Sequence, residues 1–336
     1  MRRNPAGESM LRMESDTFDL LDLQLLSALE VDGRAPFSRI AAVLGVSDRT
    51  VARRYHRLCA EGGLRVVVLR DAVRLGQDQW MLRLRCAPDG ATVIADALAR
   101  RPDTYWIGLA SGGTEIACLT RPRSPGEHDD LLLGKLPRTP SVVEIRALQL
   151  LHRFYGGPVG WLPKFRALSD EQIAALRPDL PEPEPGPARL EPGDAPLLAV
   201  LERDGRATYP ELQRATGRSE SAIKRRLSAL IASGAVYVDI EYDSAILGHP
   251  TAAILWITTA PGALDSVGRA LATHDEVAFV SATAGPSHLV VTVVVRDTAA
   301  LYAYLSGPLG HLDGVQHVET TPFLRRVKQL TYRPAR

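Results

Sequence analysis

The sequence predicts an α+β protein made of two helix-turn-helix (winged-type) heads, each followed by a ferredoxin-like βαββαβ domain. The first observation behind this prediction is a repeat. The stretch Asp32–Gly62 recurs without a gap as Asp204–Gly234, at a constant offset of 172 (204 − 32). The second is a change of pattern behind each copy, from amphipathic helices to alternating strands and helices. A repeat of this length constrains the architecture before any single element is assigned.

Both copies of the repeat have the pattern of a helix, a tight turn and a second helix. Gly45 and Gly217 are expected to end the first helix of each copy, because glycine adopts left-handed backbone angles at little cost. Ser47 and Ser219 then stand where a hydroxyl can cap the second helix. The apolar residues of the second helices share one face and are expected to be buried: Val51, Tyr55, Leu58, Ile223, Leu227 and Leu230.

The outer face of the second helix is cationic in both copies, as in a recognition helix that enters the major groove of DNA. An arginine-rich face is often only solvated, but its repetition at the same place favours DNA contact. The residues expected to contact DNA are Ser47, Asp48, Arg49, Thr50, Arg53, Arg54, Arg57, Ser219, Glu220, Ser221, Lys224, Arg225 and Arg226. Arg54 and Arg226 lie beside the inward face, so a second role stays open for them, namely to hold the helices of the head together.

The remaining elements follow from the hydrophobic periodicity. A helix Phe18–Val31, capped by Asp16 or Thr17, is expected before the first repeat, and Leu64–Leu69 is expected to be a wing or connecting strand. The strands expected in the sheet domains are Trp80–Cys86, Tyr105–Ala110, Glu115–Leu119, Val142–Leu150, Ala252–Thr258, Val277–Thr283, Leu289–Val295 and Val315–Thr321. The helices expected there are Thr92–Arg100, Asp129–Leu136, Ala263–Thr273 and Thr298–Leu309. Inside these domains the repeat offset becomes 173 (307 − 134, from the glycine pair).

The domain boundaries are placed where the composition changes. A Ser169–Gln172 capping box predicts a short helix within a proline-rich spacer, which the prolines otherwise keep extended. The expected segments are a disordered tail 1–15, a first helix-turn-helix domain 16–70, a first ferredoxin-like domain 76–155, a linker 156–189, a second helix-turn-helix domain 190–242 and a second ferredoxin-like domain 248–330.

Composition narrows the function classes. The chain of 336 residues has a formal net charge of +1, so affinity for nucleic acid must come from local patches. Cys59, Cys86 and Cys118 form no CxxC pair, which argues against a metal site or a disulfide framework and fits a reducing cytoplasm. Apolar runs are far shorter than the ~20 residues of a membrane helix. The sequence also lacks a nucleophile elbow, a phosphate-binding glycine loop and metal-ligand spacing, so we expect no catalytic residue, no cofactor, no membrane contact and no enzymatic activity.

The order of parts resembles the Lrp/AsnC family of transcriptional regulators. The resemblance rests on motifs that occur in both repeats: Asp32-Gly33-Arg34 and Asp204-Gly205-Arg206, Gly45-Val46-Ser47 and Gly217-Arg218-Ser219, and Leu75-Gly76 and Leu247-Gly248. It implies a cytoplasmic regulator that binds double-stranded DNA and senses a small effector, most often an amino acid, with its βαββαβ domain.

The resemblance also implies effector-binding residues. In the family the hairpin of the sheet domain carries Gly-x-x-Asp, which maps onto Gly112 and Glu115 in the first half and onto Gly285 and His288 in the second. His288 departs from the pattern, because an imidazole can donate a hydrogen bond where a carboxylate only accepts. The alternative, that Gly112 and Gly285 serve only a tight hairpin, stays open.

Family members dimerise through the sheet domain, so a chain with two such domains is expected to form an intramolecular pseudo-dimer, a homo-oligomer, or both. Two recognition helices would then read two half-sites about one helical turn apart. Because the repeats differ, the operator is expected to be an imperfect palindrome. Two alternatives stay open: an enzyme similar to the siroheme decarboxylases, which share this order of domains, and an architectural DNA binder without ligand response. The histidines, which a tetrapyrrole site would need close together, are scattered along the chain.

Overall fold

The computed structural model describes residues 18–121, 123, 127–182 and 188–331, so the expected disordered tail lies outside the described residues. The chain forms two compact units. We call Met1–Leu75 with Gly157–Pro250 the head unit, and Gly76–Gly156 with Thr251–Arg336 the barrel unit. The first contains both helix-turn-helix heads and the second contains both βαββαβ halves, so the predicted fold class is confirmed.

The first head consists of α2 (Leu20–Val31), α3 (Phe37–Leu44) and the recognition helix α4 (Asp48–Glu61). The predicted cap of α2 is wrong: Asp19 caps it in a reciprocal capping box with Asp22. Gly45 ends α3 with φ of 68°, and the Ser47 hydroxyl accepts a hydrogen bond from the Thr50 amide at 3.1 Å, both as predicted.

The second head consists of α8 (Ala195–Leu201), α9 (Tyr209–Thr216) and the recognition helix α10 (Glu220–Ala232). Gly217 ends α9 with φ of 68°, and the Ser219 hydroxyl accepts from the Ala222 amide. The repeated turn therefore has the same geometry in both heads. The hydrophobic core of the second head contains the predicted inward residues of α10: Ile223, Leu227 and Leu230.

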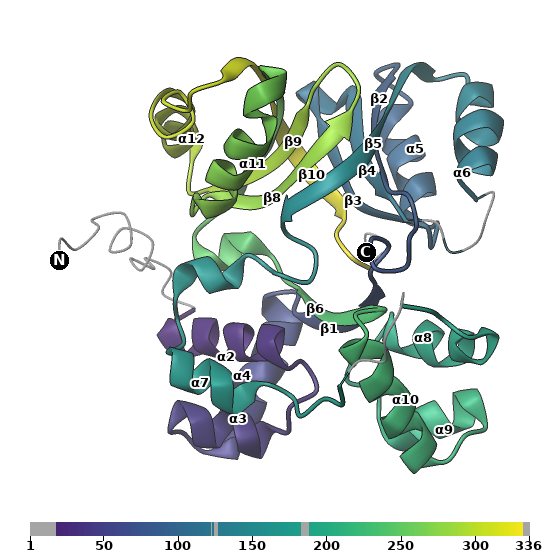
Figure 1. Cartoon of the computed structure of the whole chain (residues 1–336), viewed down its shortest axis with the longest axis vertical. Coiled ribbons are helices and arrows are strands. Elements are labelled where there is room, and N and C mark those ends of the chain that lie inside the picture. The colour runs from purple at the N-terminus through teal and green to yellow at the C-terminus, as the bar shows by residue number, and fades with distance from the viewer. Residues whose placement is uncertain (1–17, 122, 124–126, 183–187, 332–336) are drawn as a thin grey trace. The chain divides into compact units, whose positions relative to one another are not determined.

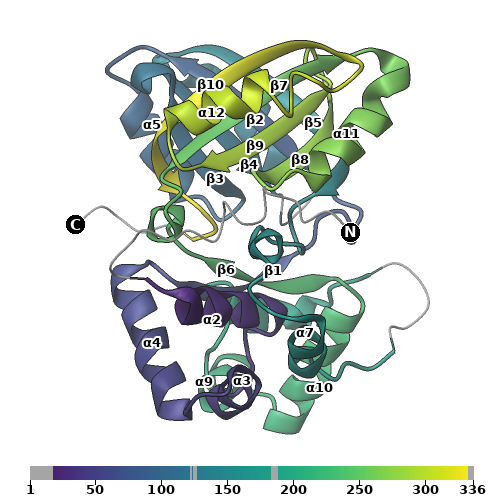
Figure 2. The same cartoon turned by 90° about the vertical axis from the view of Figure 1, so that its left-hand side faces the viewer.

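An antiparallel ribbon joins the two heads. It pairs β1 (Arg65–Arg70) with β6 (Val236–Glu241), so the stretch predicted as a wing or connecting strand is a connecting strand. Val67 lies opposite Asp239, its own counterpart in the repeat (67 + 172 = 239), which places a pseudo-twofold axis at this pair. In Figure 2 the ribbon runs across the head unit, and α4 and α10 lie on opposite sides below it. The spacer contains α7 (Asp170–Leu176), with the predicted Ser169–Gln172 capping box.

The two βαββαβ halves of the barrel unit close into one barrel, in the order β10-β3-β4-β2-β5-β8-β9-β7 (Figures 1 and 2). The strands are β2 (Trp80–Cys86), β3 (Thr104–Ala110), β4 (Glu115–Thr120), β5 (Val142–Tyr155), β7 (Thr251–Thr259), β8 (Val277–Ala284), β9 (Leu289–Val295) and β10 (Val315–Lys328). The helices are α5 (Ala91–Ala99), α6 (Glu127–Asp129), α11 (Leu264–Thr273) and α12 (Thr298–Ser306). Within each half the strand order is that of a ferredoxin-like sheet, 4-1-3-2.

The last strand of each half is longer than predicted. The expected ends at Leu150 and Thr321 are wrong, because β5 and β10 each have 14 residues. Their additional residues pair with the other half: β5 with β8, as at Tyr155 and Val280, and β10 with β3, as at Lys328 and Ile107. These two seams close the barrel, so the two halves form an intramolecular pseudo-dimer.

The helix expected at Asp129–Leu136 is irregular. It has α-helical geometry only over Glu127–Asp129, continues as a wider π-helical turn over Asp130–Lys135 and ends in a 3-10 turn over Leu136–Arg138. Pro137 explains the end, because its nitrogen has no hydrogen to donate to the preceding turn.

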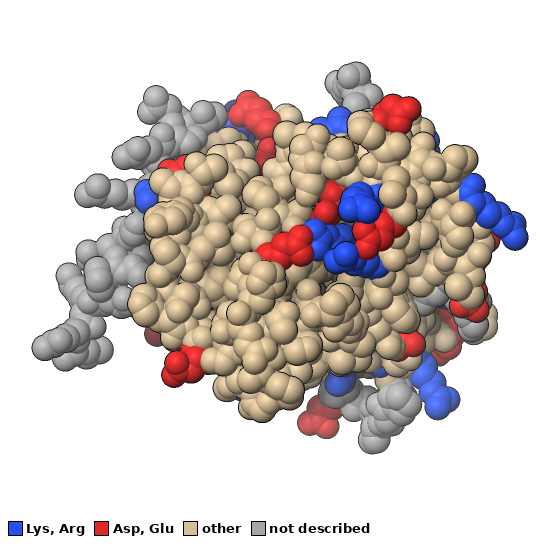
Figure 3. All heavy atoms as spheres, turned by 90° about the horizontal axis from the view of Figure 1, so that it is seen from above, with Lys and Arg blue, Asp and Glu red and all other residues tan. Residues whose placement is uncertain are grey.

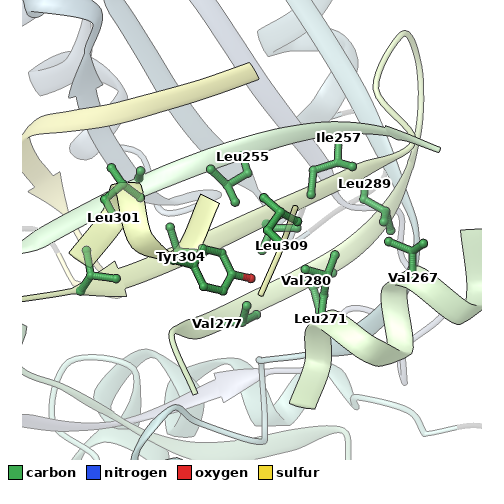
Figure 4. Packing of buried hydrophobic residues seen from close by; sticks show 14 of the residues in the cluster. Leu255, Ile257, Val267, Leu271, Val277, Val280, Leu289, Leu301, Tyr304 and Leu309 are labelled. Atoms are coloured by element: carbon green, nitrogen blue, oxygen red, sulfur yellow. The ribbon is translucent and has the colours of Figure 1, made fainter. Parts of the chain in front are cut away.

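Apolar side chains fill both faces of the barrel sheet. The outer face of the second half packs against α11 and α12, with Leu255, Val280 and Leu271 among the buried residues that Figure 4 shows. A separate cluster fills the inside of the barrel: Met81, Ala117, Leu119, Leu148, Ile254, Trp256 and Val290. The barrel interior is therefore a packed core in this region.

Candidate nucleic-acid interface and barrel mouth

The outer face of the first recognition helix is open to solvent. Asp48, Arg49 and Arg53 are exposed, whereas Val51 and Leu58 on the opposite face are buried. The Asp48 carboxylate accepts a hydrogen bond from the backbone amide of Arg49 at 2.8 Å, so this bond does not involve the Arg49 guanidinium. Within the described part of the chain, Arg49 and Arg53 form no ion pair. Their charge is available to an external anion such as a phosphate.

The second recognition helix presents less unpaired positive charge. Lys224 forms an ion pair with Glu220 at 2.6 Å, and its ammonium lies 4.7 Å from the centre of the Tyr209 ring. The ion pair raises the pKa of Lys224. Ser221 and Arg225 are exposed. The two heads therefore offer different chemistry at equivalent positions of the same scaffold.

Three of the predicted DNA-contacting arginines face their own head instead. Arg54 contacts Asp19 at 2.6 Å and the fully buried Asp22 at 3.0 Å, and Arg57 also bonds to Asp22. Arg226 in the second head binds Asp194 through two hydrogen bonds, at 2.9 and 2.6 Å. These contacts favour the second role left open for Arg54 and Arg226, which is to hold the helices of the head together.

Two of the carboxylates that these arginines bind, Asp19 and Asp194, have lowered pKa values. Burial acts to raise the pKa of Asp194, but hydrogen bonds from Arg226 and from the Glu191 amide outweigh it, so its pKa lies below the usual range. The pKa of Asp19 is lowered in the same way, with Arg54 as its main partner. Each head is thus joined internally by charge-assisted hydrogen bonds, which are stronger than neutral ones.

The predicted effector residues fall into two separate roles. Gly112 is exposed with φ of 67°, and Gly285 is exposed with φ of 147°, so both occupy backbone conformations that favour glycine. His288 places its Nδ1 2.9 Å from the carbonyl oxygen of Thr259, which ties the ring to the neighbouring strand. These positions support the hairpin alternative for the glycines.

Glu115 belongs to a charged cluster at one end of the barrel, which we call the barrel mouth. It binds Arg83 at 2.7 and 3.0 Å, and Arg83 also binds Glu319 at 2.8 Å from the other half. Next to them, Glu144 pairs with Arg146 at 2.7 Å and with Arg85 at 3.5 Å. Figure 3 shows charged side chains gathered in a small hollow of this face, surrounded by uncharged residues. The hydrogen bonds raise the pKa of Arg83 and, with Arg83 as the largest cause, lower that of Glu319.

Sequence reasoning missed the part played by Arg34 and Arg206. Both belong to the Asp-Gly-Arg motif, which the sequence offered only as a family signature. Each guanidinium donates to backbone carbonyls of the opposite head. The available signal was that the motif is identical in both repeats.

We also searched the described residues for metal ligands, reactive cysteines and membrane-spanning helices. Among the described residues no group of three or more His, Cys, Asp or Glu side chains could hold a metal ion. Burial raises the pKa of the Cys118 thiol to about 12 and also raises that of Cys86, so neither is poised as a thiolate nucleophile. In the described ranges, every helix is too short or too polar to span a bilayer.

Comparisons with known protein families match both heads and the second βαββαβ half. The family model for the AsnC-type helix-turn-helix domain matches residues 18–58, and one for winged helix-turn-helix DNA-binding domains matches 197–237. The model for the Lrp/AsnC ligand binding domain matches residues 252–332. The HTH-type transcriptional regulator FL11 of Pyrococcus horikoshii is 28% identical over 143 residues, which are 42% of this chain and 93% of the relative. The HTH-type transcriptional regulator LrpA of Pyrococcus abyssi is 26% identical over 136 residues, 40% of this chain and 96% of the relative.

Among solved structures, the siroheme decarboxylase NirDL resembles this chain over its whole length. The TM-score is 0.62, the sequence identity is 13%, and 93% of each chain is covered. At this identity the likeness is one of fold. A shared fold does not by itself assign the same function.

Proposed function

The chain belongs to the Lrp/AsnC family in a tandem-duplicated form, and we propose that it is a sequence-specific DNA-binding transcriptional regulator that responds to a small effector. The observation that carries this proposal is the pair of equivalent recognition helices, joined through a ribbon on a pseudo-twofold axis. Two such helices on one rigid support match two half-sites on one face of a duplex. DNA in the cytoplasm is the partner that this arrangement fits.

In this proposal the first head contributes most of the base recognition. Arg49 and Arg53 are exposed and free of ion pairs within the described ranges, so either can bind a guanine edge with both arms of its guanidinium. In the second head Lys224 is held by Glu220, whereas the exposed Arg225 forms no ion pair with the described residues. The operator is accordingly an imperfect palindrome with one strong and one weak half-site.

The effector in this proposal is an amino acid. The region that matches the ligand-binding model lies in the barrel unit, where the barrel mouth presents arginines and glutamates side by side. An α-amino acid carries a carboxylate and an ammonium group, which such a mixed set of charges can pair with. The residues proposed to contact the effector are Glu115, which belongs to the barrel mouth, and the hairpin residues Gly112, Gly285 and His288.

DNA binding is the first test. Fluorescence anisotropy would compare a duplex from the chain's own upstream region with a scrambled duplex, at two salt concentrations and with or without an amino-acid mixture. We expect preference for the upstream duplex, a steep salt dependence and a change on adding amino acids. The double variant Arg53→Ala, Arg225→Ala should lose binding, whereas Arg269→Ala, an exposed arginine of α11 paired with Asp265, should bind like the wild type. Equal affinity for both duplexes would contradict sequence-specific regulation.

Preference that ignores every amino acid would leave a DNA binder without this ligand response. Thermal melts with single amino acids separate this outcome, since a ligand that binds the folded state raises the melting temperature. A rise with any of them supports the effector proposal, and a flat panel counts against it.

A siroheme-decarboxylase-like activity is a second candidate, favoured by the whole-chain fold likeness to NirDL. The proposal that the chain is not an enzyme is tested by titrating it with an iron tetrapyrrole and recording the visible absorption spectrum. A saturable spectral shift together with loss of carboxyl groups from the tetrapyrrole would favour the enzyme. An unchanged spectrum would favour the regulator.

A further inference from the structure

The Asp-Gly-Arg loop of each repeat lies directly on the ribbon between the heads. The Gly205 amide donates to the Val66 carbonyl at 2.7 Å, and a Cβ added at Gly205 would lie 2.9 Å from the Val67 nitrogen. A Cβ at Gly33 would lie 2.4 Å from a methyl of Val238. Only glycine allows this approach without displacement of the ribbon, so the two loops are held at the pseudo-twofold axis.

The arginines of the two loops cross to the opposite head in a reciprocal way. Arg34 donates through its two terminal nitrogens to the carbonyls of Gly205 and Ala207, at 2.5 and 3.1 Å. Arg206 donates likewise to the carbonyls of Gly33 and Ala35, at 2.6 and 3.1 Å. Each contact maps onto the other by the repeat offset of 172 (206 − 34). We call this pair of arginines the clasp.

The clasp also reaches the helices that carry the candidate DNA-binding faces. The Arg206 guanidinium lies 4.7 Å from the centre of the Phe37 ring on α3 and 5.4 Å from that of Tyr55 on the recognition helix α4. The Arg34 guanidinium lies 5.3 Å from the Tyr209 ring on α9, which the ammonium of Lys224 on α10 also contacts. Each arginine therefore links the loop of one head to the helix-turn-helix of the other.

We infer that Arg34 and Arg206 are positioning residues that set the distance and rotation between the two recognition helices, and so the spacing of the half-sites that the chain accepts. The inference rests on the proposed DNA binding. A guanidinium is suited to this task because its planar fork fixes direction as well as distance, which an ammonium group cannot do. Each added base pair rotates one half-site relative to the other by about a tenth of a turn. A small rotation of one head relative to the other would therefore change which half-site spacing the protein binds best.

The test varies the operator spacing. Duplexes with two half-sites, separated by spacers that increase in single base pairs over one helical turn, would be titrated with wild type, Arg206→Lys and Arg203→Lys. Arg203 is an exposed arginine of the same head and gives a matched control for the same chemical change. For the wild type and the control we expect a sharp optimum, with roughly a 100-fold loss of affinity half a turn away, because both heads can no longer bind at once.

For Arg206→Lys we expect that loss to shrink to roughly tenfold, while binding to an isolated half-site stays unchanged. A profile of unchanged shape would overturn the inference, even if the affinity fell at every spacer. A wild type that binds no duplex above background would instead refute the proposed function. A second measurement, made without DNA, would then test whether the clasp fixes the distance between the recognition helices.

That second measurement is the distance between spin labels introduced through non-natural amino acids at the exposed positions Ala60 and Ser221, one on each recognition helix. We expect a narrow distance distribution in the wild type and Arg203→Lys and a broad one in Arg206→Lys. Equal widths in all three proteins would show that the clasp does not position the heads.

Discussion

Arg83 of the first repeat holds its guanidinium 5.0 Å from the centre of the Trp256 ring, and Trp256 is the residue that replaces it in the second repeat (83 + 173 = 256). The pseudo-twofold axis of the barrel brings equivalent residues together, as it would in a homodimer. Two arginines would repel each other there, whereas an arginine over an indole ring is attracted to it. Arg146 and Glu319 are another equivalent pair (146 + 173 = 319), of opposite charge, and Arg146 helps to lower the pKa of Glu319. Divergence of the repeats has thus made the two halves complementary.

The first prediction concerns Arg83. Replacing it with alanine would leave Glu115, which is almost fully buried, without its partner. We expect the free energy of unfolding to fall by about 3–5 kcal/mol, the usual cost of removing one member of a buried ion pair. Urea denaturation would measure it. Arg85→Ala is the matched control on the same strand, because Arg85 is 62% exposed and should cost within about 0.5 kcal/mol. Equal losses in both variants would contradict the role assigned to the barrel mouth.

The second prediction concerns pH. The hydrogen bond from Arg83 depresses the pKa of Glu319 in the folded state. A depressed carboxyl pKa contributes stability that is present above the unfolded value, about 4.3, and is lost as the pH falls through the folded value. The melting temperature of the wild type should therefore exceed that of Glu319→Gln at pH 6 and approach it as the pH falls below about 4. Asp89→Asn, which removes an exposed carboxylate, serves as control. A difference that persists at low pH would show that charge at Glu319 is not its origin.

The third prediction separates two adjacent arginines of α4. Arg54 binds Asp19 and the buried Asp22, whereas Arg53 is exposed. We expect Arg54→Ala to lower the stability by about 1–3 kcal/mol, because a charged hydrogen-bond partner is removed from a buried carboxylate. Arg53→Ala should leave the stability within about 0.5 kcal/mol and weaken DNA binding. Thermal melts and anisotropy on the same two proteins decide the matter, and the opposite pattern would refute the roles assigned to the two arginines.

The fourth prediction concerns the close approach of Gly205 to the ribbon. A methyl group there would meet backbone atoms of Val66 and Val67, which cannot move without disturbing the pairing of β1 and β6. We expect Gly205→Ala to destabilise the protein by about 1–3 kcal/mol, as overpacking does. Gly262→Ala provides the contrast, since a Cβ at Gly262 meets open space. A tolerated Gly205→Ala would mean that the ribbon yields.

Local patterns were sufficient for most of the elements but not for the strand pairing between the two halves. The caps at Ser47, Ser219 and Ser169 are confirmed because a cap depends on residues within one turn. The predicted length of β5 was wrong because its last residues pair with β8, whose position depends on the whole second half. The sequence alone carries no local sign of such an edge.

The candidate site shows the same division. The exposed cations Arg49 and Arg53 follow from helical periodicity alone, and the structure leaves both on the outer face. The contacts of Arg54 with Asp22, or of Arg34 with Gly205, join residues far apart in the sequence. The direction in which a long arginine side chain points depends on such distant partners. It could therefore not be predicted from the sequence.

The last prediction concerns base recognition by Arg49. It lies in the first turn of α4, is exposed, and forms no ion pair with the acidic residues that hold Arg54. An arginine in that position can bind guanine with both arms, so Arg49→Ala should cost about 1–3 kcal/mol at one half-site and relax its sequence preference. Anisotropy with duplexes in which the first or the second half-site is randomised would locate the loss. Arg225→Ala should affect the opposite half-site, which makes the two variants controls for each other. An equal loss for Arg49→Ala on specific and random DNA would mean that Arg49 contacts only phosphate, and base recognition would then fall to other residues of the same turn.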